Sequence, residues 1–282
     1  KDIKSCKVLL KKIGYPIMLK ASWGGGGRGM RVIKKESELE KSISSARREA
    51  KSAFGKDDVF FEKLIEKAYH VEVQIIGDTH GNIVHLFERD CSLQRRPQKV
   101  VERAPAAYLT ANQRSAICDA GVKIGKQVNY SCAGTVEFLM DAKTKEFFFI
   151  EVNPRVQVEH TVTEEITGID IVKAQFLLAA GAKIGDNFCG VPNQKDIHIK
   201  GHAIQSRVTT EDAANDFAPD YGKISVYRSA SGLGIRLDAG TAATGTVITP
   251  YYDSLLVKVT AKGQTPLEAT KRMDRALREF RV

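Results

Sequence analysis

The sequence predicts an α+β protein with a small first unit, residues 1–64, and a larger second unit, residues 65–282. In the first unit, helical segments are mixed with short apolar strand segments. In the second unit, two pairs of strand segments are each joined by a short polar turn, which is typical of β-hairpins. A chain of 282 residues with 43% apolar content can bury a substantial core.

The first unit is expected to contain two strands around a glycine loop, then a long helix and a third strand. Ser37 and Glu40 have the spacing of a capping box, so we expect them to start the long helix. The expected elements are the helix 4–13, the strands 16–20 and 30–33, the helix ending near 54, and the strand 59–65.

The second unit combines hairpins with capped helices. Thr110 and Gln113 form a capping box, and Thr265 with Glu268 starts the closing helix. The other expected elements are the hairpin strands 70–76 and 83–88, a helix ending near 128, the hairpin strands 134–140 and 146–152, the helix 162–180, and the strands 198–209, 223–228 and 234–237.

Composition excludes several classes of protein. No apolar run is long enough to cross a membrane, so we expect no membrane association. The five cysteines are odd in number and widely spaced, which argues against a zinc site and for a reducing compartment. The net charge of +9 is scattered along the chain, so we expect small phosphorylated molecules as partners, and no nucleic acid.

One hairpin brings two carboxylates together. If its strands pair symmetrically about Thr144, Glu137 lies directly opposite Glu151. Like charges in this position repel unless a cation lies between them. Together with the amide of Asn153, the two carboxylates form an all-oxygen set that suits Mg²⁺ or Mn²⁺. The alternative is a pair of solvated strand glutamates.

The strand that carries Glu151 continues into a run in which every odd position is polar. Side chains alternate along an extended segment, so the following residues should project from one face: Glu151, Asn153, Arg155, Gln157 and Glu159. Pro154 lacks the N–H group that a strand ladder needs. We therefore expect regular pairing to end there and the later residues to project from a loop.

A glycine-rich segment follows Lys20, with five glycines among the six residues 24–29. Such a loop can approach phosphates closely, and the lysine adds a positive charge. Its spacing fits neither the Walker motif nor the dinucleotide-binding motif, and a flexible linker is the alternative. The segment 62–65 leaves the first unit as a hinge whose backbone could bind an adenine edge.

Taken in order, these features resemble an ATP-grasp enzyme. The segments 88–99 (ERDCSLQRRPQK) and 155–160 (RVQVEH) are similar to those of the biotin carboxylases. Finer similarity to the biotin carboxylase domains of the pyruvate carboxylase family occurs at 190–194 (GVPNQ), 228–236 (RSASGLGIR) and 272–280 (RMDRALREF). The resemblance covers essentially the whole chain. It implies an ATP-grasp fold with a lid, residues 1–64, and a mainly antiparallel sheet domain, residues 65–282, without the family's N-terminal domain and short at its C-terminal end.

The resemblance also implies a reaction and its ligands. ATP and bicarbonate would form carboxyphosphate, which carboxylates biotin on a carrier domain outside this chain. Mg²⁺, Mn²⁺ or both would be held by Glu137, Glu151 and Asn153. The residues implied in ATP binding are Lys20, Gly25, Gly26, Gly27, Met30, Glu62, Lys63, Leu64, Ile65, His70 and Gln94.

Catalytic roles are implied for residues of the polar run and two others. Glu159 would be the general base that deprotonates bicarbonate. Arg207 would stabilise negative charge on biotin during its carboxylation. Bicarbonate would be bound by Lys99, Arg155, Gln157 and the backbone of Val158.

The resemblance further implies a homo-oligomer, activation by acetyl-CoA, and a location in the cytoplasm or, in a eukaryote, the mitochondrial matrix. Pro97 departs from the family pattern, in which a polar residue stands beside the nucleotide, so one nucleotide contact is expected to be missing. Three other hypotheses stay open. They are the biotin carboxylase of an acyl-CoA carboxylase, another ATP-grasp ligase such as a carbamoyl phosphate synthetase, and a nucleotide-binding fragment without catalysis.

Overall fold

The computed structural model describes residues 3–23, 30–95, 98–240 and 242–282. The chain divides into two compact units, Lys1–Lys67 and Ala68–Val282. Four residues singled out in the sequence lie outside the described part: Gly25, Gly26, Gly27 and Pro97. None of the helices within the described ranges is long and apolar enough to cross a membrane.

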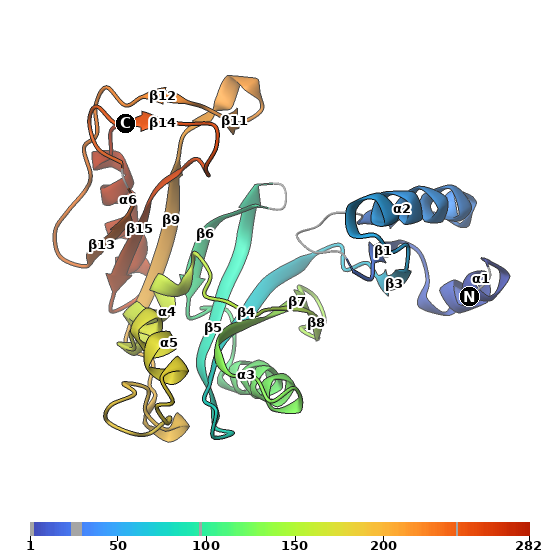
Figure 1. Cartoon of the computed structure of the whole chain (residues 1–282), viewed down its shortest axis with the longest axis horizontal. Helices are drawn as coiled ribbons and strands as arrows, with labels where there is room; N and C mark the ends of the chain where they lie inside the picture. The colour runs from blue at the N-terminus through green and yellow to red at the C-terminus, as the bar shows by residue number, and fades with distance from the viewer. Residues whose placement is uncertain (1–2, 24–29, 96–97, 241) are drawn as a thin grey trace. The chain divides into compact units, whose positions relative to one another are not determined.

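The first unit is a three-stranded antiparallel sheet with the strand order β2-β1-β3, against which the helix α2 packs (Figure 1). Its core contains Ile17, Leu19 and Ile33 from the sheet and Leu39 and Ile43 from the helix. The elements are α1 (Ile3–Ile13), β1 (Ile17–Ala21), β2 (Arg31–Ile33), η1 (Glu36–Glu38), α2 (Leu39–Phe54) and β3 (Val59–Lys63).

The predicted capping box of α2 is wrong. Ser37 lies inside the 3₁₀ turn η1, so the α-helix begins only at Leu39. The residue at its N-cap, Glu38, makes no side-chain capping bond and instead accepts a hydrogen bond from the backbone N–H of Lys34 at 3.1 Å. A spacing of three residues recurs by chance, and here the backbone already turns before the predicted cap.

The second unit is built on an eight-stranded antiparallel sheet with the order β13-β15-β9-β6-β5-β4-β7-β8. Its strands are β4 (Ala68–Gly77), β5 (Ile83–Arg95), β6 (Gln98–Ala104), β7 (Cys132–Asp141), β8 (Phe147–Asn153), β9 (His202–Thr209), β13 (Ile235–Ala239) and β15 (Leu255–Gly263). Its helices are α3 (Ala111–Gln127), α4 (His160–Thr167), α5 (Ile171–Ala179) and α6 (Pro266–Glu279). Short elements are β10 (Glu211–Asp212), β11 (Ala218–Pro219), β12 (Gly222–Lys223), β14 (Val247–Ile248), η2 (Gln194–Asp196) and η3 (Ala213–Asn215).

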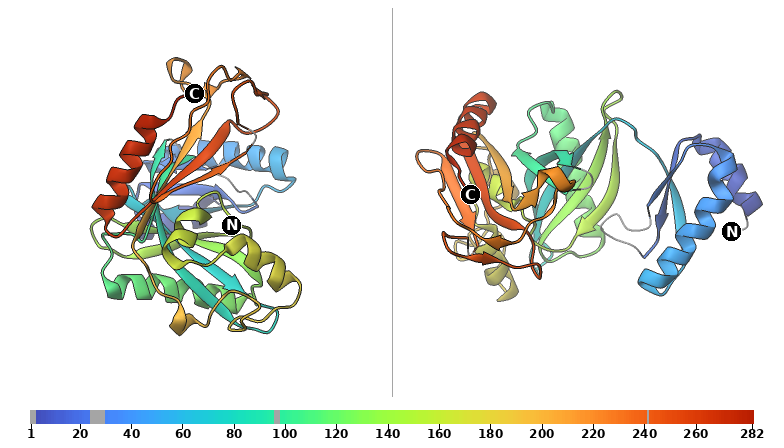
Figure 2. Two further views of the ribbon diagram at one scale, coloured as in Figure 1. Left: turned by 90° about the vertical axis from the view of Figure 1, so that its left-hand side faces the viewer. Right: turned by 90° about the horizontal axis from the view of Figure 1, so that it is seen from above.

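Helices cover both faces of this sheet. Val71 and Val73 of β4 face a core shared with α3, and a Cβ atom added at Gly121 of that helix would lie 2.9 Å from Val73. Since side chains alternate along a strand, Glu72 and Gln74 point to the opposite face, toward α4. The helix α6 packs along β15 at the other end of the sheet (Figure 2). The α4 side of the sheet is where polar side chains gather.

Sequence patterns and structure differ at three places in the second unit. The predicted helix 162–180 is two helices, because Gly168 takes the left-handed conformation (φ 76°) that ends α4, and Asp170 caps α5. The predicted strand 223–228 retains only Lys223 in a strand, and the strand expected to begin at 198 begins at His202. The capping box at Thr110 and Gln113 is confirmed.

The hairpin of β7 and β8 is confirmed where it matters for the carboxylates. Glu137 lies opposite Glu151, as predicted. A bulge follows, because Phe138 pairs with Phe149, so Ile150 has no partner residue. The strand β8 ends at Asn153, directly before Pro154, in agreement with the expectation that pairing stops there.

Candidate active site

Four charged side chains form a row across neighbouring strands of the large sheet. Glu72 of β4 lies opposite Arg89 of β5 on one side and opposite Glu137 of β7 on the other. Glu137 in turn lies opposite Glu151 of β8. Residues in these positions are close enough to interact, so the row brings one guanidinium group and three carboxylates together. Arg89 and Glu72 are fully buried, whereas Glu151 at the sheet edge is exposed.

Lys99, in β6, is surrounded by three carboxylates. Its Nζ atom lies 2.5 Å from Glu72 Oε2, 3.0 Å from Glu137 Oε1 and 2.7 Å from Glu159 Oε1. Burial alone would lower the pKa of this ammonium group, but the neighbouring carboxylates raise it. Lys99 is therefore a cation that draws together two strands of the sheet and the loop that carries Glu159.

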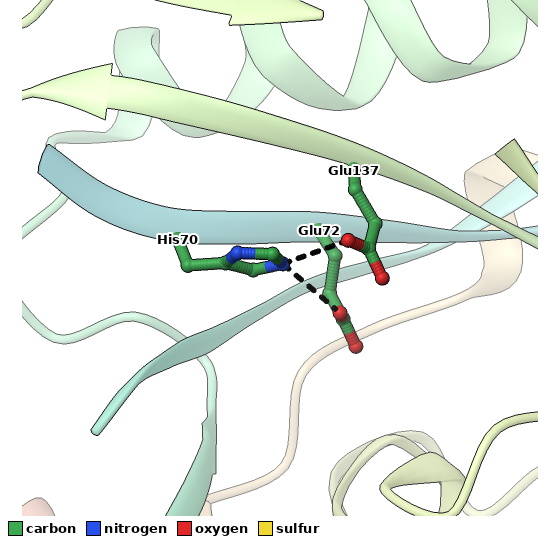
Figure 3. A group of neighbouring side chains, drawn as sticks. All are labelled: His70, Glu72 and Glu137. Atoms are coloured by element: carbon green, nitrogen blue, oxygen red, sulfur yellow. Dashed lines mark ion pairs between the residues drawn. The ribbon is translucent and has the colours of Figure 1, made fainter. Parts of the chain in front are cut away.

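Glu137 is the most densely bonded carboxylate of the site. The Nε2 atom of His70 lies 3.0 Å from its Oε2 (Figure 3), and the amide nitrogens of Asn153 and Gln157 donate to its Oε1 at 3.0 and 2.9 Å. Burial would raise the pKa of Glu137, but the adjacent imidazole of His70 and the charge of Lys99 lower it to about 2. Glu137 is therefore ionised at neutral pH.

Glu137 and Glu151 could together hold a divalent metal ion. They face each other across β7 and β8, and Asn153 contacts Glu137 from the same strand as Glu151. Two carboxylates and an amide are ligands that Mg²⁺ and Mn²⁺ accept. Glu72 and His70 also lie close to Glu137, so these three residues form a second group that could hold a metal ion. The side chains present thus fit the predicted metal ion.

Glu72 holds two cations at once. Its Oε1 lies 2.5 Å from Arg89 Nε, and its Oε2 contacts Lys99. Burial would raise the pKa of Glu72, but Arg89 and Lys99 lower it to about 2. Because Glu72 stays ionised, Lys99 Nζ has a buried anion 2.5 Å away.

Glu159 lies between two cations. Lys99 contacts its Oε1, and Arg207 of β9 donates from NH2 to its Oε2 at 3.1 Å. Arg207 is bound in turn by the fully buried Glu102, whose Oε1 accepts from its Nε at 2.8 Å. Burial raises the pKa of Glu102 more than the charge of Arg207 lowers it. The guanidinium group thus bridges two carboxylates.

A chain of uncharged side chains is hydrogen-bonded to Glu102. Gln205 of β9 donates from Nε2 to Glu102 Oε2 at 2.9 Å, and its Oε1 accepts from the Thr161 hydroxyl at 2.5 Å. The Thr161 hydroxyl is also 2.8 Å from that of Thr260 in β15. Glu102, Gln205 and Thr260 lie opposite one another, so a second row crosses β6, β9 and β15.

The other predicted residues of the second unit make different contacts. Arg155 is exposed and donates to the next carbonyl group along the chain at 3.2 Å. Gln94 is exposed and donates to a carbonyl group of β5 at 3.0 Å. The carbonyl group of Val158 accepts a hydrogen bond from Lys258 Nζ at 3.2 Å. Their roles in binding stay predictions.

In the first unit, two of the predicted nucleotide ligands contact each other. Lys20 Nζ, in β1, lies 2.5 Å from Glu62 Oε2, in β3. Lys20 lies opposite Phe60 and Glu62 opposite Met18, on the face of the sheet away from the core residues Ile17 and Leu19. The remaining predicted residues of this unit lie at or near the ends of β2 and β3: Met30, Lys63, Leu64 and Ile65.

Comparison with known proteins connects this geometry to a family. Residues 1–187 match the family model of the carbamoyl-phosphate synthase L chain ATP-binding domain, and residues 205–282 match that of the biotin carboxylase C-terminal domain. The chain belongs to the biotin carboxylase family. Pyruvate carboxylase of Bacillus subtilis is 58% identical over 269 residues, which are 95% of this chain and 23% of that protein. Human mitochondrial pyruvate carboxylase is 56% identical over 269 residues, 95% of this chain and 22% of that protein. The chain thus spans about a quarter of the length of these relatives.

Solved structures of the family have the same ATP-grasp fold. Rhizobium etli pyruvate carboxylase with acetyl coenzyme A matches with a TM-score of 0.92 and 66% identity over 96% of this chain and 24% of that one. The biotin carboxylase domain of Hydrogenobacter thermophilus 2-oxoglutarate carboxylase, in complex with MgADP, ADP and bicarbonate, matches with a TM-score of 0.91 and 45% identity. That match covers 100% of this chain and 60% of that one. These likenesses confirm the predicted α+β class and ATP-grasp fold.

Four charged residues of this candidate site are not singled out by sequence patterns: Glu72, Arg89, Glu102 and Lys258. A signal exists for the first, because Glu72 and Gln74 alternate with apolar residues in a strand whose two faces are both buried. Polar side chains in such a strand need buried partners. The partners themselves come from other strands and are visible only once the sheet order is known.

Proposed function

We propose that this chain carries out the biotin carboxylase half-reaction of a pyruvate carboxylase. ATP and bicarbonate would form carboxyphosphate, from which biotin on a carrier domain is carboxylated. The observation that carries the proposal is the contact of Lys99 and Arg207 with opposite oxygens of Glu159. A base between two cations suits an anionic substrate, because the same cations attract the anion that the base deprotonates.

In the proposed first step, Glu159 takes the proton of bicarbonate, and the bicarbonate oxygen attacks the γ-phosphorus of ATP while ADP leaves. Bicarbonate is a small planar anion, so its binding requires both positive charge and directed N–H groups. Lys99 supplies the charge, and Gln157, whose side chain is 6% exposed beside Glu137, supplies a directed amide. Arg155 and the backbone of Val158 complete the proposed set.

In the proposed second step, carboxyphosphate breaks down to CO₂ and phosphate. The phosphate accepts the N1 proton of biotin, and N1 attacks the carbon of CO₂. Arg207 is positioned to stabilise the negative charge that develops on the ureido oxygen of biotin. Because Arg207 contacts Glu159, both steps would use one continuous site.

ATP and a divalent metal are the proposed co-reactants. A metal ion at Glu137, Glu151 and Asn153 would neutralise charge on the nucleotide phosphates. His70 and Gln94 are proposed to contact the nucleotide together with the first-unit residues Lys20, Gly25, Gly26, Gly27, Met30, Glu62, Lys63, Leu64 and Ile65. The relative from Hydrogenobacter thermophilus, which is complexed with MgADP and bicarbonate, supports this ligand set.

The partners of the whole protein are proposed from its relatives. Similarity of 54–58% to pyruvate carboxylases from bacteria and fungi supports pyruvate as the final acceptor and a biotin carrier domain as partner. The Rhizobium etli relative was solved with acetyl coenzyme A as an allosteric activator, and the Hydrogenobacter domain as a dimer, which supports regulation and oligomerisation here. The proposed location is the cytoplasm, or the mitochondrial matrix of a eukaryote.

The first test replaces the proposed base in the full-length protein. Glu159→Gln is expected to lower biotin carboxylation by at least about 10²-fold, since general-base catalysis contributes that much or more. Binding of MgADP, measured by calorimetry, is expected to be unchanged because the contacts of Glu159 with Lys99 and Arg207 do not involve the proposed nucleotide ligands. The control is Glu146→Gln, an exposed glutamate before β8. Near-normal carboxylation by Glu159→Gln would remove this residue from the base role.

The second test concerns the reaction itself. ATP hydrolysis that depends on bicarbonate and is stimulated by free biotin is expected of a biotin carboxylase. Hydrolysis that free biotin does not stimulate would instead favour a carbamoyl phosphate synthetase type of ligase. Product analysis with pyruvate and with acyl-CoA as acceptors then identifies the second half-reaction. Carboxylation of an acyl-CoA alone would overturn the assignment to pyruvate.

A further inference from the structure

The buried guanidinium group of Arg89 is fully hydrogen-bonded. It has five N–H donors, and the structure gives five acceptors from five side chains. Nε donates to Glu72 at 2.5 Å. Nη1 donates to Gln74 at 2.7 Å and Thr163 at 3.0 Å, and Nη2 donates to Thr135 and Gln157, both at 3.1 Å. A side chain with all of its donors used and no exposed surface is fixed in one orientation.

The contact with Gln157 determines which way this amide points. Arginine has donors only, so the atom of Gln157 that faces Arg89 must be the carbonyl oxygen Oε1. The NH₂ group is then turned the other way, where it donates to Glu137 Oε1 at 2.9 Å. A flipped amide would put an N–H group against the guanidinium and an oxygen against an ionised carboxylate, and both contacts would be repulsive. Arg89 therefore fixes the donor side of Gln157 toward the site.

The contact with Glu72 acts on Lys99 in the same way. Arg89 holds Glu72 Oε1, which leaves Glu72 Oε2 to bind Lys99 Nζ at 2.5 Å. Both cations contact a carboxylate that is completely buried, so neither can move without leaving an unpaired charge inside the protein. Arg89 thus sets the position of the Lys99 ammonium group and the direction of the Gln157 amide.

We propose that Arg89 is a positioning residue that orients Gln157 and Lys99 for bicarbonate binding. The proposal rests on the proposed function, because it gives Gln157 and Lys99 their substrate. Arg89 is buried behind both residues and does not itself contact the anion. Loss of its planar five-donor group should therefore weaken bicarbonate binding more than ATP binding.

The test uses Arg89→Lys in the full-length protein, with Arg114→Lys as the matched control. Arg114 also binds a fully buried glutamate, Glu88, at 2.9 Å, but on the α3 side of the sheet. A lysine cannot reproduce the five directed donors. We expect Arg89→Lys to raise the KM for bicarbonate by about tenfold or more. A change of this size corresponds to the loss of about one directed hydrogen bond to an anion. The KM for ATP should stay within about twofold. Arg114→Lys should lower the melting temperature without changing either KM.

A second variant keeps the proposal testable if Arg89→Lys does not fold. Thr163→Val removes one acceptor of the Arg89 guanidinium group without a change of charge. We expect the KM for bicarbonate to rise by about threefold or more, because the guanidinium group is held less firmly, while the KM for ATP stays unchanged. A wild-type KM for bicarbonate in this variant would overturn the proposal.

A crystal structure of Arg89→Lys separates this proposal from the proposed function. We expect Gln157 and Lys99 to shift or become disordered. If both side chains keep their positions, or if Arg89→Lys changes the kinetics no more than Arg114→Lys does, Arg89 is not a positioning residue. If the wild-type protein shows no bicarbonate-dependent ATP hydrolysis, the proposed function fails, while the crystal structure still decides whether Arg89 positions the two side chains.

Discussion

Lys99 and Arg207 contact the two oxygens of one carboxylate, Glu159, but they are held in place differently. Behind Lys99 lies Glu72, which has a second cation as a partner. Behind Arg207 lies Glu102, whose other oxygen accepts a hydrogen bond from the neutral amide of Gln205. Both glutamates are fully buried, so the difference between them lies in the charges that surround each one.

The two glutamates show how charge and burial compete. Two cations outweigh the burial of Glu72 and lower its pKa to about 2, whereas one cation does not outweigh the burial of Glu102, whose pKa is raised. The Lys99 side is therefore stabilised by ion pairing. On the Arg207 side, one cation offsets only part of the cost of burying Glu102. Buried charges with such a net cost are found more often at functional sites than at sites that stabilise the fold.

The largest expected effect is on folding stability. Glu72→Gln leaves two cations facing a neutral amide in the interior, so we expect a loss of about 3–5 kcal/mol of unfolding free energy, measured by urea denaturation. The control is Glu62→Gln, which breaks the pair with Lys20, where the side chains are 37% and 17% exposed. That variant should lose less than about 1 kcal/mol. Equal losses would show that the number of buried cationic partners does not matter.

A smaller effect is expected on the Arg207 side, and on catalysis rather than stability. Glu102→Gln keeps a hydrogen-bond acceptor for Arg207 but removes the charge that fixes it. We expect the biotin-dependent rate to fall by about 10–100-fold, as a misplaced catalytic group does. Bicarbonate-dependent ATP hydrolysis without biotin should fall less, because Lys99 still contacts Glu159 and attracts the bicarbonate anion. The comparison fails if both rates fall equally.

The smallest effect is a difference in pH dependence. The pKa of Glu72 is below its ordinary value of 4.5, so its stabilising contribution is present above that value and is lost as the pH falls toward 2. The pKa of Glu102 is raised, so its ionised form destabilises the fold, and acidification relieves that cost. Urea denaturation of the wild type and both variants from about pH 7 to about pH 4 should give differences that change in opposite directions. Changes of the same sign would contradict the two pKa shifts.

Local features of the fold could be predicted from the sequence. The facing pair Glu137 and Glu151 follows from one short hairpin, whose turn sets the register between neighbouring segments. The helix at Thr110 follows from its own cap. Where a local signal was ambiguous, prediction was wrong: the helix 162–180 contains Gly168, which a helix tolerates but which here ends α4.

The rest of the site depends on pairing between distant segments. Arg89, Glu72 and Glu137 meet because β4 lies between β5 and β7, and the segment between β5 and β7 includes β6 and all of α3. Nothing local specifies this order. The row of Glu102 and Gln205 needs a still longer connection, from β6 to β9. Composition and alternation identify buried polar positions, but only the sheet order identifies their partners.

The bulge at Ile150 separates the tip of the β7–β8 hairpin from the end that carries Glu137 and Glu151. On the tip side Phe138 pairs with Phe149, and on the other side Glu137 pairs with Glu151. Deletion of one residue at the bulge would restore a regular ladder without turning Glu151 away from Glu137. The bulge therefore lies between the turn and the proposed metal ligands, which makes the exposed turn residues Lys143 and Thr144 suitable positions for a spectroscopic label.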